Sequence, residues 1–214
     1  MLHALTPLFG TDALPVVLAH AGGASRRGTD ALVAGDDEAL MLHVGKGDPA
    51  AYRALAERYL AGIVRYATRM LGDQAEAEDV AQETFLRLWR DAGRYEARGH
   101  KPSTWLYRVA HNLCIDRLRA RRPETEIDEQ HGSDRTSAPM ADKELSAQVA
   151  AALARLPERQ RAAIALVHYE EKSLEEAGIV LGCAAGAVES LLARGRRSLR
   201  EQLAAFYRDG ASNP

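Results

Sequence analysis

Twenty consecutive residues in the middle of the chain, 123–142, show no apolar periodicity and are rich in acidic and turn-forming side chains. A structureless loop of that length is uncommon inside a compact domain. The 214 residues are therefore expected to form two small domains joined by a flexible acidic linker, with halves that move independently. The predicted divisions are an N-terminal extension (1–35), a first domain (36–122), the linker (123–142), a second domain (143–207) and a tail (208–214).

On both sides of the linker, apolar residues recur at three- and four-residue intervals, which is typical of amphipathic helices. No segment of the chain shows the alternation of apolar and polar residues that is typical of a β-strand. The predicted fold class is all-α, with a helical bundle before the linker and a smaller helical domain after it. The expected helices cover residues 49–71, about 75–91 and 102–122 in the first half, and about 143–156, 158–170, 174–181 and 185–206 in the second.

Composition narrows the class of protein further. Only two cysteines are present, Cys114 and Cys183, too few for a disulfide framework or a four-thiolate metal site, and no metal or cofactor is expected. No stretch reaches the roughly 18 apolar residues that a bilayer span needs. The apolar run at 14–21 lacks the preceding basic residues of a secretory signal, so we expect a cytoplasmic protein without membrane insertion.

The formal net charge of −2 conceals strong local segregation. Residues 98–122 carry seven bases and one acid, a net charge of +6, and residues 73–96 carry −4. The stretch 124–144 adds −5, and residues 185–200 carry +3. Each block taken singly is compatible with the solvated face of an ordinary helix. Together they favour two basic surfaces and one acidic surface with separate partners.

The basic helix over 102–122 also carries residues suited to nucleic acid. Aromatic rings stack on unpaired bases, cations bind phosphates, and an amide reads a base edge. This helix holds Trp105, Tyr107 and Asn112 among its bases. A lone tryptophan such as Trp105 is more often part of a core. Tyr107 lies off the apolar stripe of Leu106 and Val109, and is expected to be the freer ring.

The second half contains the pattern of a helix-turn-helix. Ser173 and Glu176 form a predicted capping box that begins a short helix, and Gly182 ends it. Gly178, Gly182 and Val188 have the motif's spacing: a small residue where two helices touch, a glycine in the turn and a buried aliphatic residue. The second helix is expected to enter a major groove. A plain helical hairpin remains an alternative on this motif alone.

Taken together, residues 36–203 resemble an extracytoplasmic-function (ECF) sigma factor, the two-domain type of bacterial RNA polymerase specificity subunit. The stretch 75–90 resembles the family's segment that docks on the clamp helices of the polymerase large subunit. Residues 101–122 resemble its reader of the minus-ten element, and residues 156–203 its minus-thirty-five domain. The resemblance implies a sigma factor that binds core RNA polymerase, at the clamp helices and the flap, and promoter DNA, melts DNA without nucleotide hydrolysis and serves a stress-responsive regulon. An anti-sigma factor is a further implied partner.

Carried over residue by residue, the resemblance also assigns sites. A pocket for a base flipped out of its stack is implied in the loop 94–103. The implied polymerase-binding residues are Asp79, Val80, Gln82, Glu83, Phe85 and Leu86. The implied minus-ten residues are Arg94, Lys101, Trp105, Tyr107, Arg108, Asn112, Arg117, Arg119 and Arg122. The implied minus-thirty-five residues are Ala185, Gly186, Glu189, Ser190, Arg194 and Arg197.

The chain departs from the family pattern at a few positions. Glu189 and Leu191 stand where basic residues are common, and Gly178 replaces the usual alanine. A glutamate does not bind phosphate but accepts a hydrogen bond from a cytosine amino group, so Glu189 is expected to alter minus-thirty-five preference. Residues 1–35 match nothing in the family.

Three alternatives belong to other classes. A sigma-like decoy would bind an anti-sigma factor without touching promoters, but the basic helix disfavours it. A helix-turn-helix repressor leaves the acidic helix unexplained. An enzyme would need a nucleophile such as Cys114 beside His111, three residues away, yet no third residue orients the histidine. Catalytic function is therefore not expected.

Overall fold

The computed structural model describes residues 36–95, 100–121 and 148–210, and the regular secondary structure in these ranges is helical, which confirms the fold class. The predicted extension 1–35, the linker 123–142 and the end of the tail lie outside the described residues. A first group of helices contains α3 (Asp37–Gly45), α4 (Pro49–Leu71), α5 (Gln74–Asp91), the 3₁₀ turn η2 (Ala92–Arg94) and α6 (Pro102–Ala120). A second group contains helical residues 148–154, α8 (Glu158–Ile164), η3 (Ala165–Tyr169), α9 (Leu174–Leu181) and α10 (Ala185–Gly210).

Local signals explain where the helices of the first group begin and end. The Asp48 carboxylate accepts a hydrogen bond from the backbone N–H of Ala50 at 2.8 Å, and a proline occupies the first turn of α4. Gly72 ends this helix in the left-handed conformation, with φ +73°. Asp73 caps α5 by accepting from the backbone N–H of Glu76 at 2.8 Å. The predicted bounds of α4 and α5 are therefore confirmed to within a residue.

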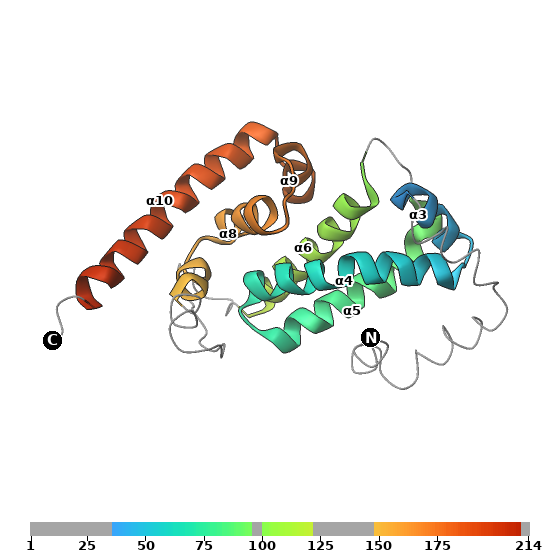
Figure 1. Ribbon diagram of the computed structural model, residues 1–214, viewed down its shortest axis with the longest axis horizontal. Coiled ribbons are helices and arrows are strands. Elements are labelled where there is room, and N and C mark those ends of the chain that lie inside the picture. Colours follow the sequence, from blue (N-terminus) through green and yellow to red (C-terminus); the bar gives the residue numbers. More distant parts are fainter. Residues whose placement is uncertain (1–35, 96–99, 122–147, 211–214) are drawn as a thin grey trace.

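Helix α3 is an element that the sequence interpretation missed. Its signals are an acidic first turn, Asp37 and Glu38, followed by apolar residues at Leu40, Met41 and Val44, which the structure buries. Asp37 contacts Arg58 and Tyr59 of α4. The short helix thus covers one end of α4 (Figure 1).

The second group deviates from the predicted helices at the end of α8, and α10 continues to Gly210, beyond the expected end at 206. A single helix was expected over 158–170, but α8 widens after Ile164 into a π-helical turn, η3. The backbone N–H of Glu170 donates to the carbonyl of Ala165, five residues earlier, at 3.1 Å. Glu171 then adopts a positive φ of 52°. This irregular end turns the chain sharply before α9.

Helices α9 and α10 form the predicted helix-turn-helix. The Ser173 capping box is present, with Glu176 returning the hydrogen bond. Gly182 lies in the left-handed region, with φ +64°, and the two helix axes differ by 93°. Gly178 lies so close to the turn that a Cβ there would be 2.6 Å from the carbonyl oxygen of Cys183. Val188 is fully buried.

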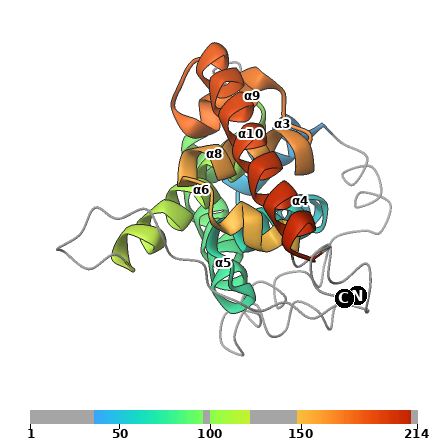
Figure 2. The same ribbon diagram turned by 90° about the vertical axis from the view of Figure 1, so that its left-hand side faces the viewer.

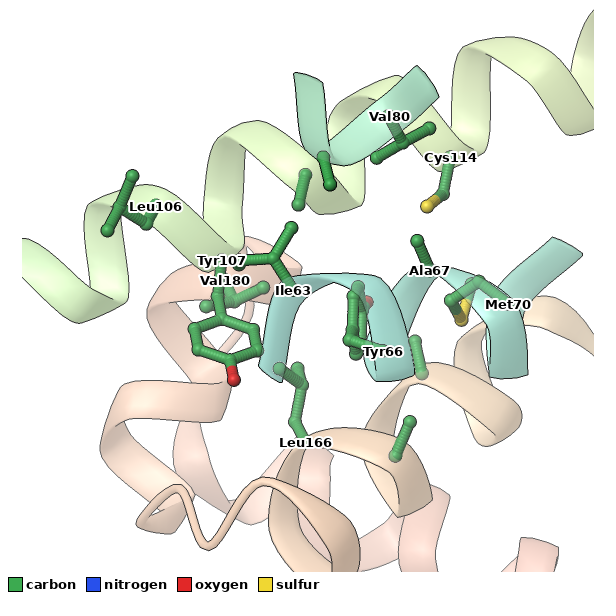
Figure 3. Close-up of a cluster of buried hydrophobic side chains, with 14 of the residues drawn as sticks. Ile63, Tyr66, Ala67, Met70, Val80, Leu106, Tyr107, Cys114, Leu166 and Val180 are labelled. Atoms are coloured by element: carbon green, nitrogen blue, oxygen red, sulfur yellow. The ribbon is translucent and has the colours of Figure 1, made fainter. Parts of the chain in front are cut away.

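The two helix groups pack side by side and share one hydrophobic core (Figures 1 and 2). Figure 3 shows Ile63 and Tyr66 of α4 between Leu106 of α6 and residues of the second group, Leu166 and Val180. All five side chains are buried. In this conformation the two groups are in contact, because apolar residues of α6 and α4 face α9 and η3 as well as α5. That the halves move independently stays a prediction.

Candidate polymerase and nucleic-acid interfaces

Helix α6 positions a polar face whose members recur at three-, four- and seven-residue intervals. Lys101, Trp105, Arg108, Asn112 and Arg119 therefore share one side of the helix. Lys101, Arg108, Asn112 and Arg119 are exposed, and Trp105 is half-buried. Trp105 packs partly against the core, yet its ring is the more accessible of the two aromatic rings predicted to stack on bases. Figure 1 shows α6 next to α4 and close to α9.

Tyr107 lies on the opposite side of α6, and the expectation that it is the freer ring is wrong. Its side chain is only 3% exposed. The ring contacts Tyr66 edge-on, with centroids 5.7 Å apart, and the hydroxyl donates to Glu170 at 2.7 Å. Burial, followed by that hydrogen bond, raises the pKa of Tyr107 well above its ordinary value, so the phenol stays protonated. In this conformation Tyr107 is not available to a base.

The remaining predicted minus-ten residues are Arg94, Arg117 and Arg122, and the first two differ in how exposed they are. Arg94 is exposed at the end of η2, and Arg122 lies outside the described residues. Arg117 is partly buried, because its guanidinium contacts the carbonyl of Glu76 and lies 3.9 Å from the Asp79 carboxylate. Arg117 therefore joins α6 to the start of α5 and is less free than Arg119.

The acidic helix α5 exposes only part of the predicted polymerase-binding set. The Asp79 side chain is 67% exposed and Leu86 is 42% exposed, while Gln82 and Glu83 are half-buried at the surface. Val80 and Phe85 are fully buried. In this conformation they are not part of the exposed face of α5, because both lie on the stripe that packs against α4 and α6.

Trp89 extends the exposed face of α5 and was not among the predicted residues. It lies three residues after Leu86, on the same side of the helix. Its side chain is 38% exposed, and its ring packs edge-on against Tyr52 at a centroid distance of 5.4 Å. The sequence signal was the continued three- and four-residue spacing from Asp79. An acidic surface with an apolar end results.

The predicted recognition helix, α10, presents its polar residues as expected. Gly186, Glu189, Ser190, Arg194 and Arg197 are exposed and recur along one side, and Ala185 is half-buried at the first turn. The opposite side packs on the core through the buried residues Val188 and Leu192. The short α9 and the turn hold the first turn of α10 at the molecular surface (Figure 2).

His111 and Cys114, the residues of the enzyme alternative, have packing roles. The His111 side chain is buried, and its Nδ1 lies 2.8 Å from the Tyr66 hydroxyl. Burial lowers the pKa of His111 to about 4 and raises the pKa of the Cys114 thiol to about 12. A thiol with a raised pKa is a poor nucleophile, because the thiolate is the reactive form.

Across the described ranges, no helix taken singly is both long and apolar enough to cross a bilayer. Helices α9 and α10 reach that limit only as a pair, and the chain bends by 93° between them.

Comparison with known proteins identifies the fold and the family. Residues 55–124 match the family Sigma-70 region 2, and residues 146–199 match Sigma-70, region 4. The chain is 36% identical over 177 residues to the ECF RNA polymerase sigma factor SigW of Bacillus subtilis, covering 76% of this chain and 94% of the relative. It is 35% identical over 215 residues to the ECF RNA polymerase sigma factor SigE of Mycolicibacterium smegmatis, covering 92% of this chain and 80% of that protein.

A solved structure supports the same assignment. CnrH, in complex with the cytosolic domain of CnrY, superimposes with a TM-score of 0.64 and 26% identity, covering 79% of this chain and 97% of CnrH. Both helix groups of the present structure therefore correspond to regions of one family, in the order that the motifs predicted. The chain belongs to the ECF RNA polymerase sigma factors, which direct polymerase to specific promoters.

Proposed function

We propose that this sigma factor initiates transcription through three separate surfaces: α5 for core RNA polymerase, the polar face of α6 for the minus-ten element, and the first turns of α10 for the minus-thirty-five element. The single observation that carries the proposal is the separation of charge among exposed side chains. Asp79 on α5 is acidic and outward-facing, whereas Arg108 and Arg194 are exposed bases on α6 and α10. Surfaces of opposite charge suit partners of opposite charge.

The α5 surface would bind the clamp helices of the polymerase large subunit. Asp79, Gln82, Glu83 and Leu86 are its contact residues, and Trp89 adds an aromatic anchor at one end. Aromatic and apolar side chains at the centre of an interface often carry most of the binding free energy, while charged neighbours set orientation and association rate. Val80 and Phe85 would act indirectly, by holding the helix in place.

The α6 surface would capture one unpaired DNA strand. Arg108 and Arg119 make no ion pair within the described part of the chain, so their charges are available to phosphates. Asn112 lies between them on the same face and would read a base edge, and Trp105 would stack on a base. Arg94 and Lys101 flank the loop in which a flipped base would be held.

The α10 surface would read duplex DNA in the major groove. Gly186 allows close approach of the backbone, Glu189 and Ser190 reach base edges, and Arg194 and Arg197 bind phosphates. Ala185 would contribute an apolar contact at the first turn. Glu189 would accept from a cytosine amino group rather than bind phosphate.

Regulation and context complete the proposal. CnrH was solved with the cytosolic domain of CnrY, and we propose that an anti-sigma factor likewise binds the present protein. The proposed domains are residues 36–122 and 143–207, and the second domain would contact the polymerase flap. The protein would act in the cytoplasm, where it would direct transcription of a stress-responsive regulon. No catalytic activity of its own is proposed, because DNA melting would draw on binding free energy.

Run-off transcription with purified core polymerase tests the proposal. Genomic fragments serve as templates, and transcript ends are mapped with and without the sigma factor. The expected result is initiation at a small set of start points only when the sigma factor is present. A protein that binds core polymerase but yields no defined start point would be a decoy. One that binds duplex DNA but not polymerase would be a repressor.

A further inference from the structure

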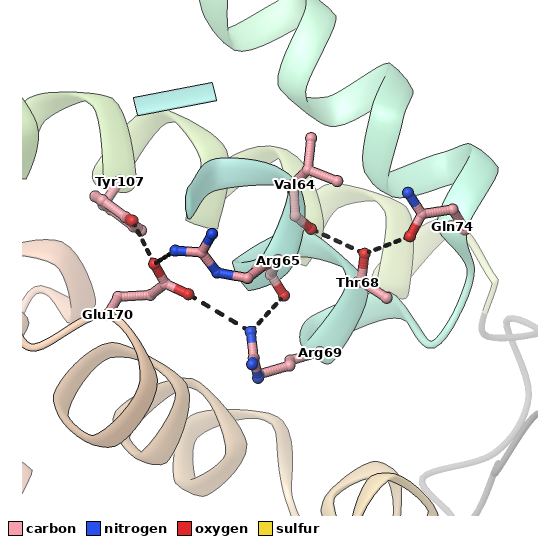
Figure 4. Close-up of polar contacts among 7 residues, drawn as sticks. All are labelled: Val64, Arg65, Thr68, Arg69, Gln74, Tyr107 and Glu170. Carbon is pink, nitrogen blue, oxygen red and sulfur yellow. Dashed lines mark hydrogen bonds and ion pairs between the residues drawn. The ribbon is translucent and has the colours of Figure 1, made fainter. Parts of the chain in front are cut away.

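A buried carboxylate joins the two helix groups. The Glu170 side chain, at the end of η3, is only 2% exposed. Its carboxylate accepts from the Tyr107 hydroxyl at 2.7 Å and lies 3.3 Å from Arg65 Nη2 and 3.5 Å from Arg69 Nη1 (Figure 4). Three donors from α4 and α6 thus converge on one acidic group of the second helix group. We call these four residues the Glu170 cluster.

The backbone at Glu170 is shaped for this contact. The π-helical turn ends with the Glu170 N–H bonded to Ala165, and Glu171 adopts a positive φ of 52°. Such irregular backbone tends to occur at functional or switching positions, because a regular helix would be the lower-energy choice. Here it ends the helix so that Glu170 points at α4 and α6 while Glu171 is exposed.

Gly62 supplies the space on the other side. It lies inside the 23-residue helix α4, where glycine is less favourable than alanine. A Cβ at this position would be 2.5 Å from the Tyr107 hydroxyl and 3.1 Å from Glu170 Oε2. The close approach of the tyrosine and the carboxylate explains the glycine.

Further contacts at the same boundary have matching chemistry. Lys101, at the start of α6, forms an ion pair with Glu176 at 3.0 Å. The ammonium of Lys172 lies 4.6 Å from the centroid of the Tyr107 ring. Carboxylates of the second group therefore contact two arginines and a lysine of the first group, and a cation of the second group contacts an aromatic ring of the first. Phosphates and bases of single-stranded DNA bind the same kinds of group.

We propose that the second helix group is an internal competitor of unpaired DNA: Glu170 and Glu176 occupy Arg65, Arg69, Lys101 and Tyr107, and single-stranded DNA adds these four residues to its contacts with the exposed face of α6 only when this packing opens. This inference rests on the proposed role of α6 as the minus-ten reader. It extends the DNA-binding surface to Arg65 and Arg69 of α4.

The energetics allow such an exchange. Only Glu170 is buried in these ion pairs: the Arg65 side chain is 56% exposed and the Arg69 side chain 25% exposed. Such pairs contribute little net stability, because solvent screens the exposed charge and the desolvation of the buried charge offsets much of the attraction. The apolar part of the contact, including Leu166 and Val180, is non-directional and reversible. DNA phosphates would replace the Glu170 carboxylate at Arg65 and Arg69. The second helix group would meanwhile move toward the upstream duplex.

Two variants and one matched control test the proposal on the full-length protein. Glu170→Gln removes the central charge, and Gly62→Ala inserts a methyl group between Tyr107 and Glu170 without removing any charge. Glu171→Gln is the control, because it changes the net charge as Glu170→Gln does, one residue further along at an exposed position. Binding of fluorescein-labelled oligothymidine is measured by anisotropy, and the radius of gyration by small-angle X-ray scattering.

Both opening variants should bind oligothymidine about tenfold more tightly than wild type, the factor expected if the open form is roughly one tenth of the wild-type population. Their radius of gyration should rise, as should that of wild type saturated with oligothymidine, while Glu171→Gln should match wild type. Circular dichroism establishes that each variant is folded. If Glu170→Gln does not fold, Gly62→Ala decides the question.

Equal affinities for all four proteins, with no expansion of wild type on saturation, would overturn the proposal. The run-off assay separates this result from failure of the proposed function. Initiation by wild type together with equal oligothymidine affinities rejects only the internal competition. If the wild-type protein does not initiate transcription, the role of α6 on which the inference rests is rejected.

Discussion

The Tyr107 hydroxyl lies 2.7 Å from a carboxylate oxygen of Glu170, although 63 positions separate the two residues in the chain. Tyr107 belongs to the helix that resembles a minus-ten reader, and Glu170 to the turn that precedes the helix-turn-helix. One hydrogen bond therefore links the two functional halves. Its strength, and the contribution of the groups around it, can be measured directly.

Removal of that hydroxyl should weaken the packing of the two halves. Tyr107→Phe keeps the ring against Tyr66 but leaves Glu170 with one donor fewer in a buried site, so the free energy of unfolding should fall by about 1–3 kcal/mol. Urea denaturation followed by circular dichroism measures the change. Tyr169→Phe is the control, because it retains the ring that stacks on Arg69. Equal losses for the two variants would contradict a special role for Tyr107.

His111 should make stability depend on pH. Burial, with a smaller contribution from Arg159, lowers its folded-state pKa from 6.5 to about 4, so the unfolded chain binds the proton more readily. The stabilising contribution is thus present above pH 6.5 and is lost as pH falls toward 4, by roughly 2 kcal/mol between pH 7.5 and 4.5. Denaturant titrations at several pH values, compared with His111→Gln, isolate this slope. Parallel curves for the two proteins would refute the assignment.

Two glycine-to-alanine changes should have different effects in the second helix group. Gly178→Ala places a methyl group 2.6 Å from the backbone carbonyl of Cys183, and the resulting overpacking should cost about 1–3 kcal/mol, more than the gain in helix propensity. In Gly195→Ala the one close contact of the new methyl group is the terminal methyl of Ile164, at 2.7 Å, which can rotate away, and its next neighbours lie at an ordinary 3.5 Å. Melting temperatures should therefore fall for the first variant and stay near wild type for the second. The reverse order would show that the turn relaxes easily.

Charge reversal on α5 should remove polymerase binding without unfolding the protein. Asp79→Lys with Glu83→Lys changes exposed or half-exposed side chains, so a pull-down with core polymerase should lose the sigma factor while its melting temperature is kept. Glu57→Lys with Glu171→Lys makes the same charge change at exposed positions elsewhere and should bind normally. Phe85→Ala should instead destabilise the fold by about 3–5 kcal/mol, because the ring is fully buried. Unchanged recovery of the Asp79 and Glu83 variant would count against this docking surface.

The exposed arginines of α6 should contribute to the salt dependence of promoter binding. Arg108→Ala with Arg119→Ala removes two predicted phosphate contacts, so the slope of log K against log salt should become shallower by about one unit per contact. Holoenzyme binding to promoter DNA at several salt concentrations measures it. Arg117→Ala should mainly lower thermal stability, because that side chain contacts the Glu76 carbonyl. A salt slope unchanged in the double variant would remove α6 from the DNA interface.

Much of the local structure was predictable from short-range signals. The caps at Asp48, Asp73 and Ser173 and the left-handed glycines 72 and 182 mark helix ends, because the hydrogen bonds that satisfy a helix terminus come from residues within a few positions. The apolar periodicity likewise predicted which side of α10 is buried. The two-region family order was also readable, since each motif is contiguous in the chain.

Tertiary packing decided the burial of Tyr107 and the meeting of Glu170 with Arg65 and Arg69. A helical period indicates an apolar stripe, but a tyrosine at its margin is stable either in water or against a partner with a hydrogen-bond acceptor. That partner lies in the other half of the chain. Contacts between distant segments depend on how whole helices pack, and neither composition nor spacing encodes that arrangement locally.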